Sequence, residues 1–295
     1  MNKIAIIMPV YNGEEYLDES IQSVLNQTYK DFQLICVNDS STDSSLEILN
    51  KYKEQDSRVV VLTKENAGPG EALNYGIKNS QSEYLCFIDQ DDKYASDYLE
   101  TMYYYITKHK LDVCLANASF LYEDGTIEKI PYYSPKKEFV KINYKLRKKL
   151  YVTRIPQWTK IVSRKYLEKY SFSFPNRENK AHDIPFHFAL LFFTNKIGVL
   201  DKNLYYHRVH SEQISYNMKP EQYYYISCKE LINWHKEHNL PKRMLFKLYL
   251  IRLITLAFKN FQKEDLDNKI YDLLDANYSF PLKNLIKMKL KKYRK

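Results

Sequence analysis

The sequence predicts an α/β protein: a mostly parallel, Rossmann-like sheet flanked by helices, followed by a helical C-terminal extension. In the first 90 residues, short apolar runs alternate with stretches whose apolar residues recur at helical spacing. Continuous apolar runs rich in β-branched residues are typical of strands that are buried on both faces. A chain of 295 residues is long enough to bury a sizeable core.

Four strands and three helices account for this first part. The strands are expected at 4–10, 34–37, 59–62 and 84–88. The helices between them carry their apolar residues at Leu17, Ile21, Val24 and Leu25, then at Leu46, Leu49 and Tyr52, and then at Ala72, Leu73 and Ile77. Because ligands of such sheets gather beyond the carboxyl ends of the strands, the polar clusters at 11–14, 38–43 and 89–92 predict one shared site.

The pattern after residue 92 is less regular. We expect a helix at 97–109, a strand at 113–120, an Asp-Gly turn within 123–126, a strand at 157–162 and a helix at 181–193. The basic, irregular stretch 132–155 is expected to be a mobile loop. From residue 221 onward the pattern is helical, with breaks at Pro241 and Pro281.

The net charge of +9 is concentrated at the C-terminal end. Residues 221–295 carry 16 basic and 8 acidic side chains, and 283–295 carry seven basic ones and no acid. Such a segment indicates binding to an anionic surface, either phospholipid or nucleic acid. The alternative is a helical subdomain with a solvated basic face.

Cysteine spacing and hydropathy bear on the compartment. Cys36, Cys86, Cys114 and Cys228 have no zinc-like spacing, and three of them lie in predicted strands, so buried reduced thiols in a reducing compartment are expected. The apolar run 4–10 is too short for a signal peptide, and 244–258 is interrupted by charges, so no membrane span is predicted. Both points predict a cytoplasmic location.

The fourth predicted strand runs directly into Asp89, Asp91 and Asp92. Three carboxylates within four residues repel one another, so a fold that gathers them usually supplies a cation. Carboxylate oxygens suit Mg²⁺ or Mn²⁺, which also bind phosphate oxygens. An acidic turn that caps the following helix is the alternative.

Four segments together resemble a family 2 glycosyltransferase of the GT-A fold, an inverting, bacterial surface-glycan type. They are IAIIMPVYNGEEYLDESIQSVLNQTY, LICVNDSSTDSS, ENAGPGEALNYGI and FIDQDD, and the resemblance extends from residue 3 to about residue 216. It implies that 1–115 form a nucleotide-sugar-binding half, 116–220 an acceptor-binding half, and 221–295 a basic helical extension outside the resemblance.

The resemblance assigns the nucleotide pocket to Pro9, Tyr11 and Glu14, and assigns Asp39 to reading the base, a uracil, through its N3–H. A helix N-cap or turn is the alternative for Asp39, and the neighbouring Asn38 departs from the acid more usual in the family. The loop and helix facing the nucleotide would contain Asn66, Gly68, Asn74 and Gly76, although tight turning and close packing explain the two glycines as well.

The same resemblance places Asp89 at the ribose or the metal and Asp91 on the metal that bridges the diphosphate. It makes Asp183 the general base, with His182 where the family usually has Glu; capping of the apolar helix by Asp183 is the alternative.

The segment LYYHRVHSEQIS would close over the diphosphate. In it Arg208 would neutralise phosphate, His210 would complete the metal shell, and Ser211 would donate a hydrogen bond. A structural role is the alternative for His210. Trp158 either stacks on a sugar ring or belongs to the core.

The function implied is transfer of a sugar from a nucleotide-diphosphate sugar to a glycan or lipid-linked acceptor, with Mn²⁺ or Mg²⁺ as cofactor. Segment 282–295 would contact the inner face of the membrane. A sugar nucleotidyltransferase is disfavoured, because PVYNGEE stands where that class carries a glycine-rich basic loop. A non-catalytic scaffold is a further alternative. Nucleic-acid binding is not expected, because residues 1–220 are nearly neutral.

Overall fold

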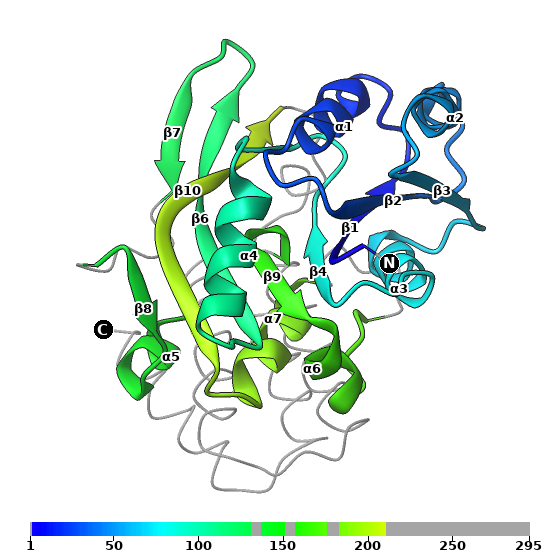
Figure 1. Cartoon of the computed structure of the whole chain (residues 1–295). Coiled ribbons are helices and arrows are strands. Elements are labelled where there is room, and N and C mark those ends of the chain that lie inside the picture. Colours follow the sequence, from blue (N-terminus) through cyan, green and yellow to red (C-terminus); the bar gives the residue numbers. More distant parts are fainter. Residues whose placement is uncertain (1, 131–136, 151–156, 176–182, 211–295) are drawn as a thin grey trace, which may run out of the picture.

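Ten strands form one sheet in the part of the chain that the computed structural model describes, residues 2–130, 137–150, 157–175 and 183–210 (Figure 1). The strand order is β3-β2-β1-β4-β9-β6-β10-β5, with β7 added beside β6 and β8 beside β10. The strands are β1 (Ile4–Val10), β2 (Phe32–Asn38), β3 (Val59–Thr63), β4 (Tyr84–Phe87), β5 (Lys93–Tyr94), β6 (Val113–Tyr122), β7 (Ile127–Ile130), β8 (Phe139–Lys141), β9 (Lys160–Ser163) and β10 (Ile197–Val209).

The first four strands are all parallel, as the sequence predicts. They are joined by α1 (Leu17–Leu25), α2 (Ser45–Gln55) and α3 (Pro69–Lys78). Each predicted strand and helix of this region is present, with ends that differ by a few residues. This half of the sheet therefore has the crossover geometry that brings the polar loops to one edge.

The remaining strands form a mixed sheet rather than a parallel one. Strand β9 runs antiparallel to both β4 and β6, and β10 is parallel to β6 but antiparallel to β5 and β8. Strands β6 and β7 form a hairpin whose Gly125 has a φ of +83°, which confirms the Asp-Gly turn. A hairpin needs no crossover helix, so the alternation that predicts parallel strands is lost after β4.

The stretch 132–155 contains regular structure where a loop was expected. Its described residues form β8 and the helix α5 (Tyr144–Leu150), in which Leu146 and Leu150 are buried. The loop prediction is wrong there, because a three-residue strand held by backbone pairing to β10 leaves no periodicity to detect. Strand β10 was also not predicted, and the expected strand 157–162 begins as a 3₁₀ turn, η1 (Gln157–Thr159).

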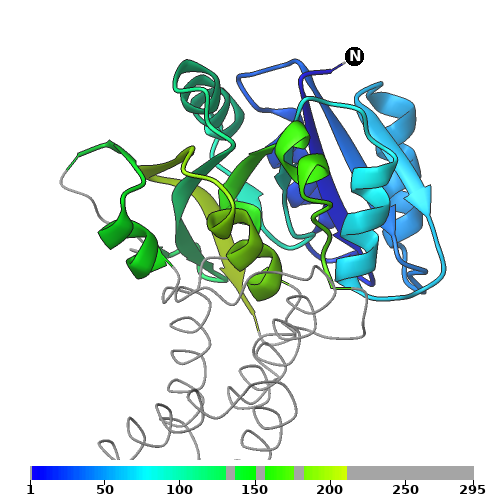
Figure 2. The same cartoon turned by 90° about the horizontal axis from the view of Figure 1, so that it is seen from below.

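Helices cover both faces of the sheet (Figure 2). One face of β1, with Ile4, Ile6 and Met8, packs in the core with α1, α2 and α4 (Tyr98–Lys108). On the other face lie α3 and α7 (Asp183–Phe192): a Cβ at Gly76 would stand 2.5 Å from Ile7 Cγ2, and Phe87 contacts Phe186 edge-on. The short helix α6 (Arg164–Lys169) adjoins α7 through a hydrogen bond from Tyr166 to the Leu190 carbonyl.

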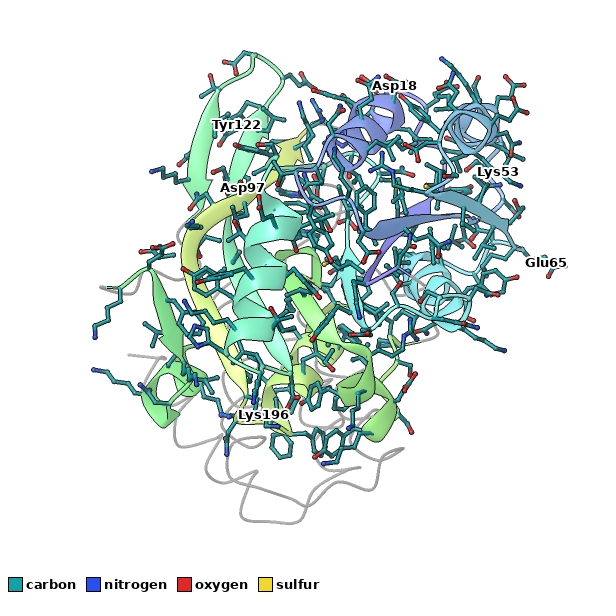
Figure 3. All side chains as sticks on the ribbon, viewed as in Figure 1. Asp18, Lys53, Glu65, Asp97, Tyr122 and Lys196 are labelled. Atoms are coloured by element: carbon teal, nitrogen blue, oxygen red, sulfur yellow. The ribbon has the colours of Figure 1, made fainter. Side chains whose placement is uncertain are left out.

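The thiols of Cys36, Cys86 and Cys114 are free and buried, as predicted, and burial raises the pKa of Cys36 to about 12. Cys228 and the expected helices from 221 onward lie outside the described residues. Within the described ranges, no helix is both long enough and apolar enough to cross a bilayer. Figure 3 shows Glu65, beyond β3, and Tyr122, in the β6–β7 hairpin, on opposite sides of the molecule.

Candidate active site

The three polar clusters meet at the carboxyl ends of β1, β2 and β4, as the sequence predicts. The Gln90 side chain joins the first cluster to the third: its Oε1 accepts from the Tyr11 N–H at 2.8 Å, and its Nε2 donates to the Tyr11 carbonyl at 3.0 Å. The Asn12 N–H donates to Ser41 Oγ at 3.1 Å, which joins the first cluster to the second. A Cβ at Gly13 would stand 2.4 Å from Gln90 Cδ, so the amide needs the space that glycine leaves.

The side chain of Glu14 forms its hydrogen bond within these loops. Its carboxylate accepts from the Ser44 N–H at 2.8 Å, and the Asp43 carboxylate accepts from the Glu14 N–H at 3.0 Å. By contrast, Tyr11 is 49% exposed and Asn66 is exposed, so both are open to a ligand. Pro9 is partly buried at the end of β1. The roles of these four residues toward a nucleotide stay predictions.

Asp39 is buried and anchors the loop between β3 and α3. Its Oδ1 pairs with Lys64 Nζ at 2.8 Å and accepts from the Ala67 N–H at 3.1 Å, while Oδ2 accepts from the Gly68 N–H at 2.8 Å. Asp39 therefore does not cap α2, which begins at Ser45. Gly68 has a φ of +86°, in agreement with the tight-turn explanation for this glycine.

The acidic loop after β4 gathers three carboxylates in different environments. Asp92 is fully buried, whereas Asp89 and Asp91 are partly exposed. Burial, followed by the charges of Asp92 and Asp91, raises the pKa of Asp89 well above its ordinary value. The carboxylate of Asp89 is contacted by Gln157 Nε2 at 3.3 Å. This loop has an excess of negative charge, which a bound cation would relieve.

Strand β10 holds the acidic loop through Asp92. The Asp92 carboxylate accepts from the Tyr205 hydroxyl at 2.6 Å and from the Arg208 N–H at 2.8 Å, and it lies 3.1 Å from His207 Nδ1. The Tyr205 oxygen also accepts from the Asp89 N–H at 3.2 Å. Burial lowers the pKa of His207, but the Asp92 carboxylate outweighs it and raises the pKa to about 9, so the pair is ionic.

The two residues predicted as metal ligands, Asp91 and His210, are brought together. His210 Nε2 lies 2.9 Å from Asp91 Oδ2, and the hydrogen bond to Asp91 raises the pKa of His210. Within the described chain, the buried His210 Nδ1 has no hydrogen-bond partner. Across the described residues, no group of three or more His, Cys, Asp or Glu side chains is arranged to hold a metal.

This donor set fits Mn²⁺ or Mg²⁺ as a partial site. One carboxylate oxygen and one imidazole nitrogen are adjacent, and ions of this class usually complete their coordination with water and substrate phosphate. Arg208 lies beside the pair: its Nε donates to the Asp91 carbonyl at 2.9 Å, and its guanidinium pairs with Glu19 and lies over the Tyr16 ring. Arg208 thus braces the Asp91 backbone, and its predicted contact with phosphate stays a prediction.

Asp183 is the first residue of α7 and is largely buried. Helix α7 packs against η1, whose Gln157 contacts Asp89, and the charge of Asp183 contributes to the raised pKa of Asp89, so the candidate base lies near the acidic loop. Arg147 of α5 fixes the other end of α7 by donating to the Thr194 carbonyl at 2.6 Å and to Asn195 Oδ1 at 2.7 Å. Helix capping by Asp183 and its role as a base are compatible with this position.

Trp158 belongs to the core, since it is 3% exposed and stacks on Tyr205 at 4.0 Å. Asn74 binds the Phe174 backbone through both amide atoms and so ties α3 to the segment before α7. Ser211 and His182 lie outside the described residues.

Sequence reasoning missed the residues that support the acidic groups: Lys64, Gln90, Tyr205 and His207. The alternation of Tyr205 and His207 at strand spacing was a usable signal, because residues two apart share one face of a strand. The partners of Lys64 and Gln90 depend on how loops from different segments meet, and the sequence has no local signal for that.

Comparison with known proteins identifies the family. Residues 5–171, more than half of the chain, match the family described as Glycosyl transferase family 2. The chain belongs to glycosyl transferase family 2. The resemblance deduced from the four segments and the expected GT-A fold are thereby confirmed.

Two relatives of this family 2 chain illustrate its similarities. A poly(ribitol-phosphate) beta-glucosyltransferase of Bacillus spizizenii is 32% identical over 260 residues, which cover 85% of this chain and 39% of the relative. Glycosyltransferase GlyA of Streptococcus pneumoniae is 32% identical over 226 residues, covering 72% of this chain and 32% of the relative. The chain thus spans about a third to two fifths of the length of these relatives.

Among solved structures, Staphylococcus aureus TarS 1–349 in complex with UDP-GlcNAc matches this family 2 chain with a TM-score of 0.73 and 23% identity. The match covers 94% of this chain and 82% of that one. At this level of identity the likeness shows a shared fold.

Proposed function

We propose that the chain is an inverting glycosyltransferase that moves a sugar from a UDP-linked donor to a hydroxyl group of a surface glycan. The observation that carries this proposal is the meeting of Asp89, Asp91 and His210 with Asp183 at one edge of the sheet. Family membership supports the reaction class. The name of the Bacillus spizizenii relative, a poly(ribitol-phosphate) beta-glucosyltransferase, supports a polymer with hydroxyl groups as the acceptor.

The proposed reaction is a single displacement. Asp183 accepts the proton of the acceptor hydroxyl as its oxygen attacks the anomeric carbon, because a neutral sugar hydroxyl is a weak nucleophile. The bond from the anomeric carbon to the diphosphate breaks, and UDP leaves with the electron pair. Attack from the side opposite the leaving group inverts the anomeric configuration.

The acidic loop would serve the leaving group. Asp91 and His210 would hold Mn²⁺ or Mg²⁺, which when bound offsets the charge that grows on the diphosphate. Arg208 keeps the Asp91 backbone in place through its bond to the Asp91 carbonyl, and Tyr205 fixes the Asp89 N–H. Asp39 would accept a hydrogen bond from the uracil N3–H. Its carboxylate is held in a fixed orientation by Lys64 and by two backbone N–H groups.

A screen of nucleotide sugars tests the proposal and its alternatives. Purified protein is incubated with UDP-, GDP- and CDP-linked sugars and an acceptor polyol or glycan, with Mn²⁺, with Mg²⁺ or with EDTA. We expect release of UDP and transfer of sugar that stop in EDTA. Release of pyrophosphate would indicate a nucleotidyltransferase, and the absence of any turnover or nucleotide binding would indicate a scaffold.

A pair of variants separates the two proposed roles. Asp183→Asn should lower transfer by about 10²- to 10⁴-fold, the usual contribution of a general base, while donor binding survives. Asp91→Asn should weaken donor binding in the presence of metal as well. Asp201→Asn, on β10 outside the site, is the matched control and should keep its activity. Full transfer by either test variant contradicts the role assigned to that residue.

A further inference from the structure

Lys160 has an unusual environment near the site and takes no part in the proposed mechanism. It begins β9, which lies between β4 and β6 within the sheet, and its side chain is fully buried. Lysine is almost never fully buried unless an anion compensates its charge. The position therefore calls for a neighbouring carboxylate.

The register of β9 decides which face of the sheet Lys160 occupies. The next residue, Ile161, pairs with Cys86 on β4 and Cys114 on β6, and all three pack in the core on the side of α1 and α4. Because successive side chains of a strand point to opposite faces, Lys160 points to the other face, where α7 lies. Strand β9 thus directs an ammonium group toward the helix that begins with Asp183.

Two residues of α7 interact electrostatically with this lysine. Asp183 and His187 are four residues apart and so share one face of the helix. Burial and then the charge of Lys160 lower the pKa of His187, and burial lowers the pKa of Lys160 to about 7 against the opposing effect of the Asp183 carboxylate. Both effects require Lys160 to lie close to that face.

The charges around Asp183 explain why such a cation matters. Asp183 lies close enough to Asp89 to affect it, and Asp91 and Asp92 follow in the same loop. An anion placed beside other anions in a partly desolvated site is disfavoured unless a cation offsets it. The ammonium form of Lys160 would offset this negative charge from a buried position in the sheet.

We propose that Lys160 is a positioning residue that holds the Asp183 carboxylate in place to accept the proton of the acceptor hydroxyl. The proposal rests on the proposed role of Asp183 as the general base. The pairing of the two charges is independent of that role, and each part therefore has its own experiment.

The pairing is tested by a double-mutant cycle on thermal stability. Lys160→Met, Asp183→Asn and the double variant are compared with the wild type by differential scanning calorimetry. Because removing one member of a buried pair strands the other, Lys160→Met should lower Tm much more in the wild type than in the Asp183→Asn background. Equal shifts in the two backgrounds overturn the pairing. If Lys160→Met does not fold, the double variant must still fold better, or the pairing is overturned.

The positioning role is tested by kinetics with the full chain and a UDP-sugar donor found in the screen. Lys160→Met should lower kcat by about 10- to 100-fold, part of the 10²- to 10⁴-fold that a general base contributes, with the KM for the donor unchanged. Lys160→Arg, which keeps the charge, should recover most of the loss. Lys202→Met, which removes a half-exposed lysine paired with Glu138, is the matched control and should leave both constants unchanged.

The outcomes separate the two proposals. An unchanged kcat in Lys160→Met, or a loss that Lys160→Arg does not recover, overturns the positioning role even when Tm shows coupling. If the wild type transfers no sugar from any donor while Tm coupling is present, the proposed function fails and the charge pair stands.

Discussion

Two acidic loops border the site, one after β2 and one after β4, and their carboxylates differ in how far their charge is compensated. Asp39 in the first loop receives Lys64 and two backbone N–H groups at 2.8 to 3.1 Å. Asp89 in the second loop is contacted by Gln157 at 3.3 Å, and its pKa is raised by burial and by its acidic neighbours. The charge of Asp39 in the first loop is compensated by Lys64, which follows β3, whereas the second loop is left with an excess of negative charge.

This difference indicates what each loop is prepared to bind. A carboxylate that is already fixed by internal donors keeps its orientation without a ligand, so the Asp39 region is preorganised for a neutral, hydrogen-bonding group. A loop with uncompensated charge gains most from a cation. The exception within the second loop is Asp92, whose carboxylate is hydrogen-bonded by β10. This structural acid is thereby distinguished from Asp89 and Asp91, the proposed ligand-binding acids.

Replacing Asp92 should have the largest effect on stability. Asp92→Asn removes the anion that keeps the buried His207 protonated, and we expect a loss of about 3–5 kcal/mol in the free energy of unfolding, measured with urea. Glu123→Gln, in the exposed β6–β7 hairpin, is the control and should be neutral. A more stable variant would mean that relief of repulsion in the loop outweighs the pair with His207, and the distinction drawn for Asp92 would be lost.

Adding a divalent cation should affect the second loop alone. At 100 times its Kd, Mn²⁺ without nucleotide should stabilise the wild type by about 2.7 kcal/mol. The shift should disappear in Asp91→Asn and persist in Lys64→Met, because Lys64 pairs with Asp39 of the first loop. Thermal shift without nucleotide measures this, and equal responses of the two variants would remove the contrast between the loops.

Breaking the Lys64–Asp39 pair should have an intermediate effect. Lys64→Met leaves the nearly buried Asp39 with two backbone donors in place of three partners, and we expect a loss of about 1–3 kcal/mol together with weaker UDP binding. Lys53→Met, on the exposed face of α2, is the control in both urea unfolding and calorimetric titration (Figure 3). Unchanged UDP binding would show that the pairing of Lys64 with Asp39 has only a structural role.

Removing the Tyr205 hydroxyl should have the smallest effect. Tyr205→Phe retains the stacking on Trp158 but deletes the bridge between Asp92 and the Asp89 N–H, at a cost of about 0.5–1.5 kcal/mol. The loss of orientation at Asp89 should nevertheless lower transfer measurably. A variant with lower stability and unchanged kcat would limit Tyr205 to a structural role.

The parallel half of the fold was predictable because each strand is a continuous apolar run and each helix keeps a buried stripe such as Leu17, Ile21 and Val24. The second half was not, because its strands pair by hairpins and by edge contacts that depend on partners far away in the sequence. Strand β10 illustrates this: polar and aromatic residues at its end hide a strand that the whole acidic loop depends on.

The candidate site was predictable as a set of residue types and less so as a set of contacts. The sequence predicted that the three loops converge and that Asp91 and His210 come together, and both are observed. It did not predict that Glu14 binds a neighbouring loop or that Asp39 is held by Lys64. Short polar motifs specify chemistry, whereas the partner of each polar group is fixed only when distant loops fold together.

The pairing register between β10 and β6 shifts on either side of Asn203, and this shift constrains the number of residues in that part of β10. Val199 pairs with Leu115 and Tyr205 with Ala118, so β10 contains three more residues than β6 over the same span, through irregularities on either side of Asn203. An odd excess reverses which side chains face each layer of helices. A one-residue insertion or deletion between 199 and 205 would therefore turn Tyr205 and His207 away from Asp92, so homologous enzymes should vary in length at the β6–β7 turn and keep this interval constant.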